Sequence, residues 1–124
     1  MILTVDMNNE YNHLVNKFVT FLCKELCILP RDITITSYDL AEHRGMCFDE
    51  DTGKFTILIK ENGRNIGEVF TTIAHEMIHV KQYMKEDLGK LLDENNSLPY
   101  EKRWWEKEAF ENAVPLVEKF SKTL

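Results

Sequence analysis

The chain has 124 residues, of which 44% are hydrophobic and 29% are charged. That length holds one core, so we expect residues 1–124 to form a single domain, and the apolar content excludes intrinsic disorder. The 21 acidic and 15 basic residues give a net charge of -6, which argues against nucleic acid as a direct partner because phosphate contacts need a basic surface. No apolar run reaches the roughly 18 residues that a membrane span requires, and the start lacks a secretory-signal pattern.

Three cysteines cannot all pair, and their spacing does not form the disulfide framework of a small secreted domain. Cys23 and Cys27 lie four residues apart in an apolar segment, so we interpret them as buried free thiols. Free thiols are typical of a reducing compartment, and we therefore expect a cytoplasmic protein without a membrane partner.

The first element predicted from the spacing of apolar residues is a helix over about 10–28. Asn8 or Asn9 can cap this helix, and Pro30 lies just beyond its end. Residues 33–36 then alternate and are rich in β-branched side chains, which predicts a short strand.

A hairpin follows, with strands at 46–48 and 54–60 and a turn of acidic residues and glycine at 49–53. Asn65 can cap the next element, a long helix from 66 to about 86. This helix is amphipathic, so we expect one of its faces to pack against the sheet.

Residues 87–103 are predicted as a loop, with a helical turn around Leu91 and Leu92. A last helix runs from about 103 to 121, and Pro115 inside it is expected to cause a kink or a break. The order of elements predicts an α+β fold, in which helices pack on a small antiparallel sheet of about three strands.

The most informative motif is His75-Glu76-Met77-Ile78-His79 on the long helix. Two histidines four apart project from the same helix face, one turn above the other, and both imidazoles can bind a single Zn²⁺. Glu76 follows the first histidine directly and lies to the side of the metal, where it can act as a general base toward water. This arrangement is the His-Glu-x-x-His motif of zinc peptidases.

A catalytic zinc usually has three protein ligands and one open position. Only His13 and His43 remain as other histidines, and both precede the motif, so a carboxylate is the better candidate. Glu106 and Glu108 lie in the last helix, but residues two apart point in nearly opposite directions.

Helix geometry favours Glu106 as the third ligand because it shares a face with small and apolar residues, including Ala109. A carboxylate on the core side of a helix needs a partner, which a buried metal would provide. Glu108 shares its face with polar residues and is the second choice. Ala109, one turn beyond Glu106, would allow a close approach to the helix that carries His75 and His79.

The His75–His79 motif followed by Trp105-Glu106-Lys107-Glu108-Ala109 resembles compact gluzincin-type metallopeptidases, including ImmA/IrrE-like and small, often phage-encoded, SprT-like proteins. The resemblance covers about residues 44–113. In that group a Glu-x-x-Ala element supplies the third zinc ligand, and Glu106 matches that position. The sequence departs from the group at Trp104, where related peptidases tend to have proline. SprT itself uses a third histidine, and none follows His79 here.

The resemblance also implies a zincin-like fold and a protein or peptide substrate bound along an edge strand, for which Phe55–Lys60 is the candidate. A peptidase needs a donor for the oxyanion of the tetrahedral intermediate. Tyr100 and Arg103, just before the last helix, are the candidates for this role.

Other residues near the motif are candidates for supporting the histidines. These residues are Thr71, Thr72, Gln82 and Tyr83. Two alternatives to the peptidase remain. A deformylase-like amide hydrolase would use the upstream Cys47 as third ligand, although most of that family's sequence pattern is absent. A zinc-binding interaction module would keep the motif without activity, and Glu76 would then be dispensable.

Overall fold

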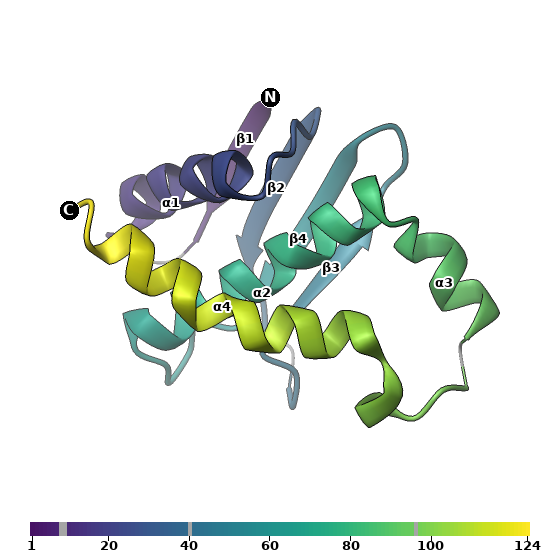
Figure 1. The fold of residues 1–124 in the computed structure, drawn as a ribbon. Coiled ribbons are helices and arrows are strands. Elements are labelled where there is room, and N and C mark those ends of the chain that lie inside the picture. The colour runs from purple at the N-terminus through teal and green to yellow at the C-terminus, as the bar shows by residue number, and fades with distance from the viewer. Residues whose placement is uncertain (8–9, 40, 96) are drawn as a thin grey trace.

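The computed structural model describes residues 1–7, 10–39, 41–95 and 97–124, which form an α+β fold with four helices and one mixed sheet (Figure 1). In chain order the elements are β1 (Ile2–Asp6), α1 (Asn12–Glu25), β2 (Asp32–Ser37), β3 (Gly45–Asp49), β4 (Lys54–Ile59), α2 (Ile66–Lys85), α3 (Leu88–Glu94), the 3-10 turn η1 (Tyr100–Lys102) and α4 (Trp104–Ser121).

The sheet has the strand order β1-β2-β4-β3. β1 pairs with β2, and β2 with β4, in parallel, while β3 and β4 form the antiparallel hairpin. The expectation of about three antiparallel strands is therefore wrong in strand number and in direction. β1 and β2 are joined through α1, and such a helical crossover returns the chain in the same direction and makes the pair parallel.

The expected edge strand, Phe55–Lys60, is not at an edge. β4 lies between β2 and β3 and is paired on both sides. The buried pattern of Phe55, Ile57 and Ile59 fits this interior place. The edge strand beside α2 is β3, because the second strand of the hairpin joins β2 and leaves the first outside.

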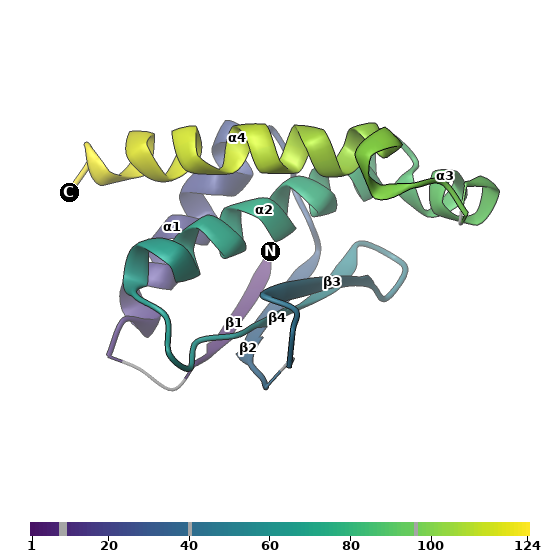
Figure 2. The same cartoon turned by 90° about the horizontal axis from the view of Figure 1, so that it is seen from below.

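The helices cover one face of the sheet (Figure 2). α1 and α2 pack on the strands, and α4 lies over α2 as an outer layer. Phe18 of α1, Phe70 of α2 and Phe120 of α4 join the three helices, with the Phe18 ring centroid 4.8 Å and 4.9 Å from the other two. Across the described part of the chain, every helix is too short or too polar to cross a lipid bilayer.

The helix ends differ in part from those expected. The cap on α2 is confirmed, since the Asn65 side chain accepts a hydrogen bond of 2.9 Å from the Glu68 backbone N–H within a capping box. Asn8 and Asn9, proposed as caps for α1, lie outside the described residues. Cys27 follows α1 in a left-handed conformation and is exposed, so only Cys23 of that pair is a buried thiol.

Two elements of the C-terminal half differ in part from the expectation. The segment 87–103 contains a helix of two turns, α3, where a loop with a single helical turn was predicted. α4 continues through Pro115 without a break. The buried residues Ala113 and Phe120 hold the helix against its neighbours on both sides of the proline, which offsets the lost hydrogen bond.

The close contact of α4 with α2 depends on small side chains. Ala113 is 1% exposed in this contact, so Ala113→Leu should force the helices apart and lower the free energy of unfolding by about 1–3 kcal/mol. Val114→Leu is the control, because Val114 is exposed on the same helix and its replacement should change stability by less than about 0.5 kcal/mol. Urea unfolding measures both; equal effects would contradict the packing.

Candidate metal centre

α2 presents His75 and His79 on adjacent turns of the same face, as the spacing predicts. Their ring centroids lie 4.9 Å apart with the rings edge to face. His79 is buried, while the His75 side chain keeps 22% exposure. The capping box fixes the start of α2, and the buried side of the helix fixes its rotation, so the histidines have a defined direction.

α4 brings the Glu106 carboxylate between the two imidazoles. Glu106 Oε1 lies 3.2 Å from His75 Nε2 and 2.8 Å from His79 Nε2. One ligand atom from each of the three residues lies within 4.8 Å of the others. Ligands bound at about 2.0–2.1 Å to one tetrahedral zinc would be roughly 3.3 Å apart, so this nitrogen and oxygen donor set fits a zinc ion.

The pKa shifts of Glu106 and His79 show that each side chain stabilises the charged form of the other. Burial raises the pKa of Glu106, but the hydrogen bonds from His75 and His79 have the larger effect. The net pKa is lowered from 4.5 to about 2. Burial lowers the pKa of His79, and the contacts with Glu106, Glu76 and Gln82 outweigh this and raise it. Without metal, Glu106 is therefore an anion that favours the protonated form of His79.

Glu76 lies on the sheet side of the histidines and is 6% exposed. Burial raises its pKa, which the positive field of His79 and His75 partly counters. A carboxylate with a raised pKa beside a metal site is suited to accepting a proton near neutral pH.

Gly45 of β3 allows the sheet to approach this carboxylate. A Cβ atom at Gly45 would lie 2.6 Å from Thr72 Cγ2 and 3.1 Å from Glu76 Oε2. Glycine therefore lets the start of the edge strand pass directly beside Glu76. Sequence reasoning missed this role, because nothing in the chain pattern shows which helix the strand will contact.

The site opens into a cavity of about 260 Å³ between α2, β3, α3 and the start of α4. Tyr100, on η1, lines this cavity and is 57% exposed. Burial and the nearby Glu106 raise its pKa. The other lining residues are Gly45, Met46, Cys47, His75, Glu76, His79, Tyr83, Leu88, Leu92, Trp105 and Glu106.

The structure does not bring Arg103 into the site. Arg103 is the residue before α4, and its Nε donates a hydrogen bond of 2.9 Å to the Leu98 carbonyl. It does not line the cavity in the described part of the chain. In this position Arg103 ties the preceding loop to α4, and its expected role as an oxyanion donor stays a prediction.

Glu108, the second choice for a ligand, also faces α2, but it contacts Gln82 and Lys81 and does not join the ligand atoms of His75, His79 and Glu106. Its Oε1 accepts hydrogen bonds of 3.0 Å from Gln82 Nε2 and 3.1 Å from Lys81 Nζ. The pKa of Glu108 is lowered by these bonds, against the effect of burial. The helix argument expected Glu108 on a solvent-exposed face, whereas its side chain is partly buried against α2.

The residues proposed to support the histidines take different places. Gln82 Oε1 lies 2.7 Å from His79 Nδ1. Thr72 accepts from Arg64 Nη2 at 2.6 Å and packs against Gly45. Thr71 donates to the Gly67 carbonyl. Tyr83 lines the cavity, and burial followed by nearby acidic groups raises its pKa to about 12.

Cys47 lines the cavity but does not join the group of ligand atoms. Burial, then Glu76 and Asp49, raise the pKa of its thiol well above the ordinary value. Its Sγ is not among the ligand atoms that lie within 4.8 Å of one another, which belong to His75, His79 and Glu106. The deformylase-like alternative therefore lacks support from the geometry.

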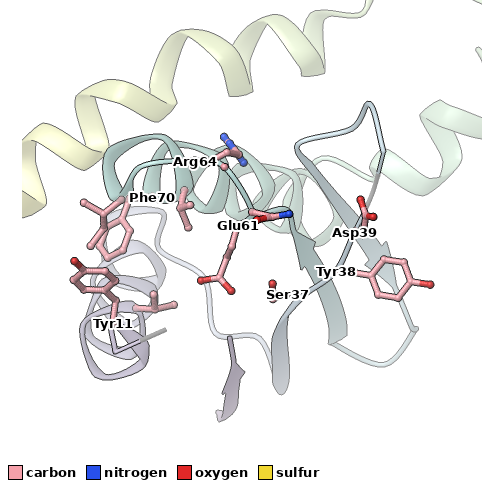
Figure 3. Close-up of a pocket in the computed structure, with 12 residues that line it drawn as sticks. Tyr11, Ser37, Tyr38, Asp39, Glu61, Arg64 and Phe70 are labelled. Atoms are coloured by element: carbon pink, nitrogen blue, oxygen red, sulfur yellow. The ribbon is translucent and has the colours of Figure 1, made fainter. Parts of the chain in front are cut away.

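A larger cavity, of about 660 Å³, lies near the ends of β2 and β4 and the start of α2 (Figure 3). It shares no described residue with the metal centre and has no histidine or cysteine in its described lining. The Arg64 side chain extends from its rim to Thr72 and to the Lys60 carbonyl. This cavity is therefore distinct from the candidate centre in place and in chemistry.

The charge coupling predicts how pH changes the stability of the metal-free protein. His79 has a folded pKa above 6.5, so its stabilisation is complete below about 6.5 and is lost as pH rises through the folded pKa. Glu106 has a folded pKa of about 2 against 4.5, so its contribution is present above about 4.5 and is lost as pH falls toward about 2.

Urea unfolding with a chelator should therefore show stability falling from pH 6 to 9. Burial of Glu76 acts in the same direction from about pH 4.5 up to its raised folded pKa, because it favours the neutral form. In Glu106→Ala the decline should be shallower, since His79 loses the carboxylate that raises its pKa. An equal decline in both proteins would contradict the coupling of Glu106 to His79.

The close approach at Gly45 gives another prediction. Gly45→Ala should lower the free energy of unfolding by about 1–3 kcal/mol, because the added methyl group collides with Thr72 and presses on Glu76. Gly89→Ala is the control: nothing lies within 4 Å of its would-be Cβ, and alanine should stabilise α3 by up to about 1 kcal/mol. Thermal unfolding of the two variants checks this, and a neutral Gly45→Ala would be inconsistent with the geometry.

Comparisons of the chain with protein-family models, with curated proteins and with solved structures found no match. The features of the chain that bear on function are therefore the convergence of His75, His79 and Glu106 and the position of Glu76 beside them.

Proposed function

We propose that this protein is a zinc-dependent peptidase of the gluzincin type, with His75, His79 and Glu106 as metal ligands and Glu76 as general base. The observation that carries the proposal is the placement of Glu106 Oε1 at 3.2 Å and 2.8 Å from the two histidine Nε2 atoms. Two imidazoles and one carboxylate leave one corner of a tetrahedral zinc open, which is the pattern of a catalytic site.

The zinc, when bound, acts as a Lewis acid toward a peptide carbonyl and lowers the pKa of water to near neutral values. Glu76 would accept a proton from the attacking water on its carboxylate and would pass it to the leaving amine. Its burial supports this role, because the raised pKa makes the carboxylate a stronger base than an exposed glutamate. Tyr100, on the cavity wall, is the proposed donor to the oxyanion.

An extended peptide would pair with the free edge of β3. Arg44 and Glu50 flank β3. The Arg44 carbonyl accepts a backbone hydrogen bond from Lys60, just after β4, and the Glu50 N–H donates one to Lys54, the first residue of β4. Because bonding alternates along an antiparallel pair, the backbone groups of 45, 47 and 49 point to the outer edge, where no described strand pairs with them. This edge borders Glu76, so strand addition would place a peptide bond at the site.

The proposed substrate is a flexible segment of a protein or a peptide, since the cavity of about 260 Å³ is too small for a folded substrate to enter. The free thiols Cys23, Cys27 and Cys47 fit a reducing compartment, and we place the protein in the cytoplasm.

Glu76→Gln tests the proposal most directly. Glutamine keeps the shape but cannot accept the proton, so cleavage should fall by about 10²–10⁴-fold. Zinc stoichiometry and thermal stability should stay close to those of the unchanged protein. Mass spectrometry of a mixed peptide library incubated with zinc-loaded protein measures cleavage, and Glu111→Gln, an exposed change on α4, is the matched control.

Retention of cleavage in Glu76→Gln would overturn the role of Glu76. If the unchanged, zinc-loaded protein cleaves no peptide in the library, the zinc-binding interaction module becomes the better interpretation. In that case zinc should still raise the unfolding temperature, because the ion joins α2 to α4.

A further inference from the structure

Gln82 makes hydrogen bonds with every polar atom of its side chain and is fully buried between α2 and α4. Its Nε2 donates a hydrogen bond of 2.9 Å to the Trp105 carbonyl and another of 3.0 Å to Glu108 Oε1. Its Oε1 lies 2.7 Å from His79 Nδ1. These partners join the second histidine to the helix that carries Glu106.

The partners fix the orientation of the Gln82 amide. The Trp105 carbonyl and the Glu108 carboxylate can only accept hydrogen bonds, so the NH₂ group must face them. The amide oxygen then faces His79, and it too can only accept. His79 Nδ1 must therefore carry a hydrogen, which leaves Nε2 as the nitrogen directed at Glu106 and the metal position.

Glu108 holds this amide in place. Its Oε1 accepts from Gln82 and from Lys81 Nζ, and Lys81 Nζ also lies 2.7 Å from Glu86 Oε1. Rotation of the amide by half a turn would put its oxygen against the Trp105 carbonyl and Glu108, and its NH₂ against the hydrogen on His79. Each of these contacts would be repulsive or would leave a buried group unpaired.

We propose that Gln82 is a positioning residue, anchored by Glu108 and the Trp105 carbonyl, that selects the Nδ1–H tautomer of His79 and so presents Nε2 to the metal. The proposal deepens the proposed function and rests on its metal site. It also gives the two glutamates separate tasks: Glu106 binds zinc, and Glu108 supports the side chain that orients His79.

The first test does not depend on zinc. In the metal-free Glu106→Ala variant, His79 loses the carboxylate at Nε2 and keeps its hydrogen bond with Gln82 at Nδ1. Long-range ¹H–¹⁵N NMR at a pH where His79 is neutral should place the hydrogen on Nδ1. In the double variant that combines Glu106→Ala with Gln82→Leu, the hydrogen on His79 should move from Nδ1 to Nε2. A hydrogen on Nε2 in the single variant would overturn the proposal.

The second test measures zinc affinity by competition with a chromophoric chelator at constant pH. Gln82→Leu should bind zinc about 10–100-fold more weakly than the unchanged protein. Glu111→Gln, the matched change of an exposed glutamate on α4, should bind with unchanged affinity. Unchanged affinity in a folded Gln82→Leu would contradict the positioning role while leaving the metal site intact.

The two tests separate the failure of this inference from the failure of the proposed function. If the unchanged protein binds no zinc, the metal site fails, and the NMR result still decides whether Gln82 selects the tautomer. If Gln82→Leu does not fold, the Glu106→Ala spectrum decides the question with Gln82 in place.

Discussion

The Glu106 carboxylate between the His75 and His79 imidazoles is the interaction on which the site depends. It joins two helices that are far apart in the sequence, and it requires them to lie close together. Ala109, one turn beyond Glu106 and fully buried, provides that closeness. The contact between the tilted rings of Phe18 and Phe120 holds the other end of α4, so the core fixes the direction from which Glu106 approaches the histidines.

A second constraint comes from the sheet. β4 is held between β2 and β3, which leaves β3 as the free edge, and Gly45 lets that edge pass beside Glu76. The group that would accept a proton and the backbone that would align a peptide are therefore neighbours. The two glutamates differ because of their surroundings. Burial raises the pKa of Glu76, whereas the two histidines lower the pKa of Glu106.

Much of this arrangement could be predicted from local pattern. The spacing of apolar residues and the Asn65 cap predicted α2, and the choice of Glu106 over Glu108 came from helix geometry alone. Contacts between distant segments could not be predicted. The place of β1 beside β2 depends on a crossover, and the hydrogen bonds of Gln82 join residues more than 20 positions apart. Their formation depends on the register of α4 against α2, which no single segment determines.

The most direct test of the central claim is anomalous X-ray scattering at the zinc absorption edge from crystals grown with zinc. The structure predicts one peak bonded to His75 Nε2, His79 Nε2 and a Glu106 oxygen at about 2.0–2.2 Å, with no fourth protein ligand. A peak coordinated by Cys47 or Glu108, or the absence of zinc between the two histidines, would contradict it.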